Sequence, residues 1–445
     1  MLESLLACPR CDKALEDLRC SACKVEFPLR NGIAWLFSDP DTAMTEWHNR
    51  WQMALAQLDQ DTQRAEAALK ATSSEATRSR LNHLRDGYRK QKRLLTDMLQ
   101  PLQLTESANL EAMLALRTRL PTHQGLTSYA ANAFRDWCWG DVENAASLDA
   151  IEQSLADHEP RKILVLGAGA GRLAYDLHQA RKPDITVALD NNPLFVYLLD
   201  QIARGEKPTL VEFPLAPKNA EDAAIERTLN APKPAVPGFH AILADGLRCP
   251  FVAGAFDLVV TPWFVDVVPE TPADLIPRIN RLLSGNGIWI NHGSLAFSNV
   301  DPGQRLSLAE LIEITRASGF TDVTSSEREI PYMDCPDSRH RRVESVLTIS
   351  ARKHTNAKQP ERHQALPEWI VTGREPVPAL PAFQSQATST RIHAFIMSLI
   401  DGKRSLRDMA ILMEAQRLMP AKEAEAAIRG FLIKMFEEAS SSRSY

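Results

Sequence analysis

Three glycines at a strand-to-helix junction are the residues of this sequence best suited to holding a cofactor. Gly167, Gly169 and Gly171 follow the apolar run "KILVL" and precede a helical pattern. Glycine at such a turn lets the backbone adopt positive φ and approach a ligand closely. A dinucleotide fingerprint would place its third glycine at position 172, which is Arg172. The spacing therefore favours a different cofactor, with a ligand-free tight turn and a nicotinamide site as the alternatives.

Two carboxylates follow the next strand-like runs of this region. Asp190 ends "ITVALD", where a carboxylate can accept hydrogen bonds from ribose hydroxyls. Asp245 ends "FHAILAD" and is placed to bond an adenine amino group. Glycines spaced by two, with an acidic residue ending the next strand, are the pattern of S-adenosylmethionine-dependent methyltransferases. The three positions together predict S-adenosylmethionine as the cofactor.

Four cysteines near the N-terminus predict a metal site. Cys8 and Cys11 form one C-x-x-C pair, and Cys20 and Cys23 form a second. Two such turns can present four thiolates to one zinc ion, with rubredoxin-like iron and plain reduced cysteines as the alternatives. So short a segment could hardly hold a core without a metal. The spacing therefore predicts structural zinc.

The middle of the chain, from about residue 127 to 353, resembles the carnosine N-methyltransferase family. The likeness rests on "FRDW", "ENAASLDAI", "GAGAGRLAYDL" and "WFVDVVPETPADLIPRINRLLSGNGIWINHGSLAFS". The resemblance implies a class I methyltransferase fold in which Arg135 reaches the cofactor together with the glycine turn and the two carboxylates. It also implies that Asp266 positions the substrate nitrogen. The alternative for Arg135 is a surface salt bridge with Asp136 or another neighbour.

The position of Asp266 also indicates chemistry without the resemblance. It follows the strand-like run "FDLVVTPWF", at the carboxyl end that faces the ligand crevice of open α/β sheets. A carboxylate there can hold one N–H of an imidazole, so that the lone pair of the other nitrogen attacks, and it stabilises the charge that develops. Trp263 and Phe264 are either an apolar wall around the sulfonium or core residues. The alternatives for Asp266 are a cap on the helix near Pro272 or a bond to a loop amide.

The predicted acceptor pocket departs from the family at two places. The family has a histidine just after the fifth strand, where this chain has Ser298. His292 either compensates or is an ordinary strand-end residue. The family's tyrosines before the last strand correspond here to "RHRRVESV", which contains Arg341. Because arginine binds carboxylate and phosphate bidentately, we expect an imidazole or amine acceptor that is carnosine-like or more acidic, unless these arginines are solvated surface charge.

The elements that position these residues alternate between strand-like and helix-like runs. Seven strand-like runs predict an α/β fold with a doubly wound, mostly parallel sheet, whose last two strands can form an antiparallel hairpin at the edge. The predicted domains are a zinc ribbon (1–40), a helical segment (41–124), the methyltransferase domain (125–353), a linker (354–387) and a small helical or winged-helix domain (388–445).

Both terminal segments resemble small domains of other proteins. "LLACPRC" and "CSACKVEFPLRNGIAWL" resemble the zinc-ribbon proteins that activate tRNA and release-factor methyltransferases, which implies structural support or substrate docking. "SLIDGKRSLRDMAILM" and "AAIRGFLIKMFEEA" resemble the winged-helix domain of the peptide-binding protein in pyrroloquinoline quinone biosynthesis. We therefore expect a small-molecule or peptide substrate, with a protein partner conceivable at either end.

Composition and charge indicate which broad classes of protein this chain can belong to. The 445 residues are 44% hydrophobic and 24% charged, which is typical of a soluble globular protein of about two to four domains. A net charge of −5 disfavours broad binding to nucleic acid. No run reaches the ~18 apolar residues of a membrane span and the start is not that of a signal peptide, so the cytoplasm is the expected compartment. The alternative to an enzyme is a non-catalytic scaffold or cofactor sensor that binds a peptide or protein.

Overall fold

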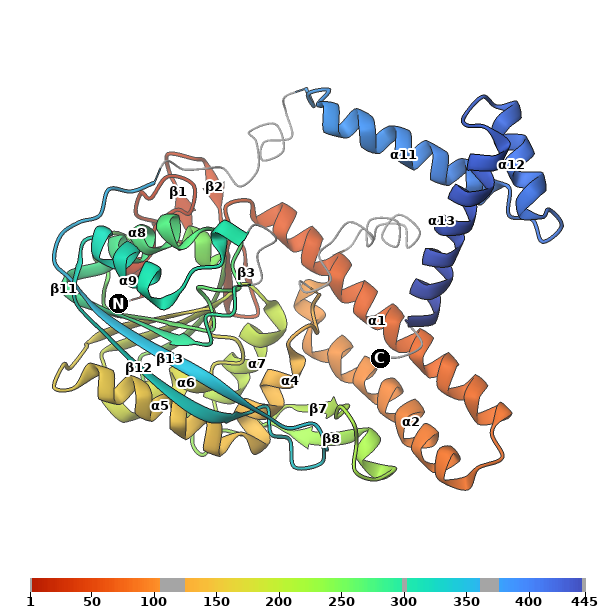
Figure 1. The fold of residues 1–445 in the computed structure, drawn as a ribbon. Helices are drawn as coiled ribbons and strands as arrows, with labels where there is room; N and C mark the ends of the chain where they lie inside the picture. Colours follow the sequence, from red (N-terminus) through yellow and green to blue (C-terminus); the bar gives the residue numbers. More distant parts are fainter. Residues whose placement is uncertain (1, 105–124, 298–301, 361–375, 442–445) are drawn as a thin grey trace. The chain divides into compact units, whose positions relative to one another are not determined.

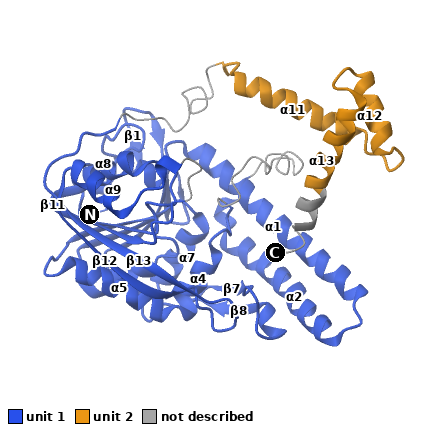
Figure 2. Cartoon of the chain, viewed as in Figure 1, with its two compact units in different colours: residues 1–362 blue, residues 363–445 orange. Residues whose placement is uncertain are grey.

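The structure is a computed structural model that describes residues 2–104, 125–297, 302–360 and 376–441. The chain divides into two compact units, Met1–Arg362 and His363–Tyr445 (Figure 2). The candidate cofactor, acceptor and metal residues named above all belong to the first unit. Among the described residues, no helix has both the length and the apolar character that crossing a bilayer requires.

A nine-stranded sheet organises the first unit (Figure 1). Its strands are β3 (Leu29–Arg30), β4 (Ile33–Leu36), β5 (Lys162–Leu166), β6 (Ile185–Asp190), β9 (Phe239–Ala244), β10 (Phe256–Pro262), β11 (Leu283–Gly293), β12 (Phe320–Tyr332) and β13 (Arg342–Lys353). They lie in the order β12-β13-β11-β10-β5-β6-β9-β4-β3. All seven predicted strands are present, and β12 and β13 form the antiparallel pair at one edge. The predicted doubly wound, mostly parallel fold is therefore confirmed, and two strands from the N-terminal segment extend it.

Helices cover both faces of the sheet, as strands that are buried on both sides require. They are α5 (Asp141–Leu155), α6 (Arg172–Arg181) and α7 (Pro193–Ala203) on one face, and α8 (Pro272–Leu282) and α9 (Leu308–Ala317) on the other. Successive strand residues belong to different cores: Leu164 packs with the second group of helices and Val165 with the first. This alternation follows from the period of two in a strand.

The carboxyl ends of four neighbouring strands meet at one edge of this sheet. β9, β6, β5 and β10 pair in parallel with one another in that order. Each of these strands ends next to one candidate position. The glycine turn follows β5, Asp190 ends β6, Asp245 follows β9, and the segment around Asp266 follows β10. Because parallel strands point the same way, all four positions lie along the same edge.

The N-terminal segment covers part of the sheet that no helix covers. The link from β9 to β10 contains only a short 3₁₀ turn, η6 (Gly246–Arg248). Leu5, Leu6 and Phe27 from the N-terminal segment are buried there with Phe251 and Phe256. The backbone joins in, since Ala7 N donates to Pro250 O at 2.8 Å and Val252 N donates to Leu5 O at 2.9 Å. The segment also contains β1 (Arg19–Cys20) and β2 (Val25–Glu26), which pair antiparallel.

The helical segment predicted over residues 41–124 forms a long hairpin of two helices in its described part, which ends at residue 104. Helices α1 (Pro40–Ala71) and α2 (Glu75–Met98) pack against each other, and the short turn η2 (Gln100–Leu102) follows. Asp39 caps α1 by accepting a hydrogen bond from Thr42 N at 3.1 Å. Trp47 and Trp51 anchor α1 in the same core as α5 and α7. The remainder of the predicted helical segment, from 105 to 124, lies outside the described residues.

Three helices make up the described part of the second unit. They are α11 (Pro381–Ser398), α12 (Leu406–Ala415) and α13 (Ala421–Ser441). Ile396, Met409, Met413 and Ile428 are buried at their centre. Ser405 and Asp408 form a capping box at the start of α12. The described residues 376–441 contain no strand, and α11 begins inside the segment that was predicted to be a linker.

Candidate functional site

The glycine turn connects β5 to α6 through three residues with left-handed backbones. φ is +68° at Gly167, +57° at Gly169 and +87° at Gly171. A Cβ at Gly167 would lie 2.5 Å from Phe264 Cδ2, and one at Gly171 would lie 2.3 Å from Leu199 Cδ2. A Cβ at Gly169 would meet nothing within 4 Å. Packing therefore explains two of the glycines, whereas Gly169 faces open space where a ligand can approach the backbone.

Asp190 fastens this turn from the end of β6. Its Oδ2 accepts a hydrogen bond from Gly169 N at 2.8 Å, and its Oδ1 accepts one from Asn192 N at 2.8 Å. Burial raises the pKa of Asp190, and the hydrogen bonds from the backbone N–H groups of Asn192, Gly169 and Asn191 partly offset that rise. The carboxylate that was predicted to bind ribose thus lies directly against the glycine turn.

Asp245 lies at the end of β9 and begins the turn η6. Its Oδ1 accepts a hydrogen bond from Leu247 N at 2.9 Å, while its Oδ2 has no hydrogen-bond partner among the described residues. Burial raises the pKa of this carboxyl, against the Leu247 bond and the positive charges of Arg248 and Arg278. One carboxylate oxygen is therefore left for a ligand.

An aromatic pair follows β10, next to the glycine turn. The ring of Phe264 lies between two glycines, because a Cβ at Gly167 would lie 2.5 Å from Cδ2 and one at Gly246 would lie 2.8 Å from Cζ. Trp263 has φ +49° and donates from its backbone N to His292 O at 2.7 Å. Its ring lies 4.8 Å from that of Tyr332. A bulky residue with positive φ is strained, and such strain is concentrated at functional sites.

Asp266 is held by the loop that follows β11. Its Oδ2 accepts hydrogen bonds from Ala296 N at 2.8 Å and from Ser294 Oγ at 3.4 Å. The N-cap of α8 is Thr271, so Asp266 does not cap that helix. The bond to a loop amide is therefore present, and Oδ1 makes no hydrogen bond with a described residue.

Arg135 forms the ion pair with Asp136 that was the alternative to a cofactor role, but the pair is buried and not at the surface. Its Nε donates to Asp136 at 2.7 Å and its Nη1 donates to Glu143 at 2.8 Å. Burial would lower the pKa of Arg135, but the two carboxylates raise it, so the guanidinium stays charged. Its Nη2 has no hydrogen-bond partner among the described residues. Arg135 begins the π-helical turn η4 (Arg135–Trp139), which follows α4 (Ala130–Phe134).

The turn η4 packs directly on the glycine turn. Trp137 Nε1 donates to Ala170 O at 2.8 Å. Arg172 N, at the start of α6, donates to Asp136 Oδ2 at 3.3 Å. The helical segment that leads into the sheet therefore fixes the same loop that Asp190 fixes from the other side.

The remaining candidate residues of the acceptor pocket are His292, Arg341 and Ser298. His292 is 2% exposed within β11, with Nδ1 2.9 Å from Thr348 Oγ1, and its Nε2 has no hydrogen-bond partner in the described part of the chain. Burial, with the charges of Arg328 and Arg135, lowers its pKa to about 4, so its ring is neutral. Arg341 forms an ion pair with Asp334 at 3.0 Å, and its side chain is 59% exposed. Ser298 lies outside the described residues.

Two residues that the sequence analysis did not select belong to this region. Glu143 accepts from Arg135 and, through Oε2, from Met333 N at 2.8 Å. The ring of Tyr332 packs at a tilt of 47° against that of Trp263, and the guanidinium of Arg342 lies 4.4 Å from the centre of the Tyr332 ring. The spacing of eight residues between Arg135 and Glu143 gave no signal, because residues that far apart on one helix do not meet, and these two meet only since the chain turns at Gly140 between η4 and α5. The sequence held no signal for Tyr332 either. Its partners are Trp263, which follows β10, and Arg342, which begins β13, and both are distant from the local pattern around Tyr332.

The four N-terminal cysteines gather into one cluster. Their Sγ atoms all lie within 4.8 Å of one another, and Cys11 Sγ is 3.5 Å from Cys20 Sγ. Tetrahedral zinc with bonds of ~2.3 Å would need sulfur separations of about 3.8 Å, so this donor set fits the ion in number, type and spacing. Arg10 N points at Cys8 Sγ and Cys23 N at Cys20 Sγ, each at 3.4 Å. Such N–H···S contacts support thiolate ligands.

Comparisons with known proteins show similarity only at the level of the fold. No family model and no curated protein sequence matches the chain. The N-methyltransferase NodS from Bradyrhizobium japonicum, solved with S-adenosylhomocysteine, is 14% identical over 48% of this chain and 88% of its own, with a TM-score of 0.33. Human N-acetylserotonin methyltransferase, solved with S-adenosylmethionine, is 15% identical over 62% and 71%, with a TM-score of 0.32. Phosphoethanolamine N-methyltransferase 2 from Haemonchus contortus is 14% identical over 53% and 58%, with a TM-score of 0.34.

Proposed function

We propose that this chain is an S-adenosylmethionine-dependent methyltransferase that acts on an imidazole or amine nitrogen. One observation carries the proposal. The glycine turn, Asp190, Asp245 and the Asp266 segment follow four neighbouring parallel strands and share one sheet edge. Such an edge is where open α/β sheets bind their ligands.

The chain's own residues supply the groups that a nucleoside cofactor needs. S-adenosylmethionine, when bound, supplies an electrophilic methyl group. Gly169 offers open backbone, Asp190 lies against that glycine, and Asp245 keeps one oxygen free. Phe264, whose ring lies between Gly167 and Gly246, offers an apolar surface beside the glycine turn.

Asp266 is the proposed catalytic residue. The bond from Ala296 N fixes its Oδ2, and its Oδ1 remains able to accept a hydrogen bond. An N–H of the acceptor held by Oδ1 leaves the lone pair of the reacting nitrogen free. The carboxylate also stabilises the positive charge that the nitrogen gains. Holding the acceptor in one orientation provides much of the acceleration that a displacement reaction needs.

We propose that the acceptor is a carnosine-like small molecule or a peptide with an acidic group. Arg342, at the start of β13, lies over the ring of Tyr332, which packs at a tilt against Trp263, and Arg341 directly precedes Arg342. These guanidinium groups suit a carboxylate or phosphate on the acceptor. A mass-spectrometric substrate screen tests this step, and free carnosine as the best substrate would refute the acidic preference.

We further propose that the cysteine cluster binds structural zinc. The cluster belongs to the segment that covers the sheet beside Asp245, so its role is support for that loop and not chemistry. All seven cysteines are free, which suits a reducing compartment such as the cytoplasm. The cysteine-bearing segment and the second unit are the surfaces where a protein partner would bind.

The first test is binding of S-adenosylhomocysteine by calorimetry, followed by labelled S-adenosylmethionine with a metabolite extract. We expect binding and a labelled product. Asp266→Asn should keep the binding but lower kcat about 100-fold, since an amide cannot replace the charge. Asp322→Asn is the matched control, because Asp322 is a 72% exposed carboxylate on β12. A folded, zinc-loaded protein that binds no cofactor would instead support a non-catalytic scaffold that binds a peptide or protein.

A further inference from the structure

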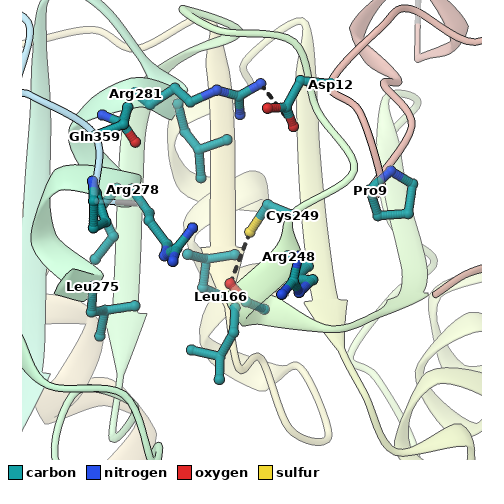
Figure 3. A pocket seen from close by; sticks show the side chains of 14 residues that line it. Pro9, Asp12, Leu166, Arg248, Cys249, Leu275, Arg278, Arg281 and Gln359 are labelled. Atoms are coloured by element: carbon teal, nitrogen blue, oxygen red, sulfur yellow. Dashed lines mark hydrogen bonds and ion pairs between the residues drawn. The ribbon is translucent and has the colours of Figure 1, made fainter. Parts of the chain in front are cut away.

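A cavity lies behind the loop that carries Asp245. Its volume is about 110 Å³. Its walls come from the turn η6 and Cys249, from one side of α8, from residues 9 and 12 of the N-terminal segment, and from residues 359 and 360 (Figure 3). The mechanism proposed above uses none of these side chains.

Three arginines line this cavity from two elements. Arg278 and Arg281 come from α8, and Arg248 comes from the turn η6, on the other side of the cavity (Figure 3). The only acidic residue among the lining residues is Asp12. Asp12 forms an ion pair with Arg281 at 3.3 Å. The lining itself thus carries three guanidinium groups and one carboxylate, and Glu270 pairs with Arg278 from outside the lining.

Arg278 has unused hydrogen-bonding capacity toward the cavity. Its Nε and Nη2 both approach the same oxygen of Glu270, at 3.0 and 2.9 Å. Its Nη1 has no hydrogen-bond partner among the described residues, although the side chain is only 23% exposed. A partly buried guanidinium with one free nitrogen is a strong donor to an oxyanion.

Arg281 and Cys249 stiffen the wall without adding negative charge. Arg281 Nη1 donates to Phe251 O at 3.2 Å, which ties α8 to the loop after η6. Cys249 Sγ donates to Gly246 O at 3.0 Å. Burial and the nearby Asp245 charge raise the pKa of Cys249, so it stays a neutral thiol. The cavity is thus built from fixed groups.

We propose that this cavity binds a phosphate group, either as the free ion or as the end of a phosphate monoester. Guanidinium groups match phosphate oxygens in geometry and charge, and three of them border a space as large as about four water molecules. The site uses none of the carboxylates proposed for methyl transfer, although Leu166, which directly precedes the glycine turn, and Gly246, which follows Asp245, also line it.

The test is a titration of the full-length, zinc-loaded protein with inorganic phosphate, in a phosphate-free buffer at constant ionic strength. We expect saturable binding by calorimetry and a saturable rise in Tm. Arg278→Gln should weaken binding at least tenfold, and Arg248→Gln provides a second, independent variant. Arg316→Gln, an exposed arginine on α9, is the charge-matched control and should bind as the parent does.

Further probes separate the sources of the phosphate. Methyl phosphate that binds as tightly as inorganic phosphate would identify a monoester site, and much weaker binding would identify a site for the free ion. Tighter binding of acetate than of phosphate would overturn the proposal, as would unsaturable phosphate effects or equal affinity in both arginine variants and the control. The same samples are also tested for binding of S-adenosylhomocysteine. That measurement tests the methyltransferase proposal separately from the phosphate proposal.

Discussion

Asp190 accepts a hydrogen bond from the backbone N–H of Gly169 at 2.8 Å, so the carboxylate predicted to hold the cofactor also holds the turn that faces it. Asp190→Asn replaces one accepting oxygen by an NH₂ group, which then faces the N–H of Gly169 or Asn192. We expect a loss of about 1–3 kcal/mol in the free energy of unfolding and at least tenfold weaker binding of S-adenosylhomocysteine. Chemical denaturation and calorimetry measure these, with Asp322→Asn as the control. Unchanged affinity would remove Asp190 from the cofactor site.

The glycine turn offers a matched pair of variants. Gly169→Ala meets open space, so it should cost only the ~1–2 kcal/mol of a left-handed backbone. Gly167→Ala adds a clash with Phe264 and should cost more, about 2–4 kcal/mol.

A double-mutant cycle with Phe264→Ala isolates that clash. Phe264→Ala should make Gly167→Ala less costly and leave the cost of Gly169→Ala unchanged. Equal coupling in both cycles would show that the ring does not pack against Gly167.

His292 gives stability a pH dependence of defined sign. Its folded pKa is about 4 and its unfolded pKa is near 6.5. Between these values the unfolded state binds a proton that the folded state does not, so stability falls as pH falls through this window. In this window the free energy of unfolding changes by up to about 1.4 kcal/mol per pH unit. Below the folded pKa, His292 no longer contributes to the pH dependence. His292→Gln should lack this component when unfolding is measured from pH 7 to 4. A parallel pH profile in parent and variant would contradict a buried, neutral ring.

The cysteine cluster predicts a stability linked to zinc. One zinc per chain is expected by elemental analysis, and a chelator or Cys20→Ser should lower Tm strongly and expose apolar surface to a hydrophobic dye. Cys138→Ser, outside the cluster, should retain the zinc and most of the stability. Full stability after complete removal of the metal would limit the cluster to a peripheral role.

The sequence predicted the sheet because its central strands are short, nearly continuous apolar runs with glycine or acidic residues at their ends. It did not predict β4, since "IAWL" is short and its partner, β9, lies about two hundred residues further along the chain. The acidic positions could be found because each one ends or closely follows a strand-like run. Three contacts depend on how loops fold back, which local pattern does not encode: the bond from Ala296 to Asp266, the packing of Tyr332 against Trp263 and the ion pair of Arg135 with Glu143.

The position of β4 has a consequence for how the chain is made. Residues 33–36 leave the ribosome well before their partners on β9 and the rings of Phe251 and Phe256. At about 5–20 residues per second, the leading segment waits on the order of ten seconds or more with its apolar side uncovered. If the cysteine knuckle closes locally during that interval, this segment is partly folded before the sheet forms. Its apolar side stays exposed until then, and a chaperone can bind it.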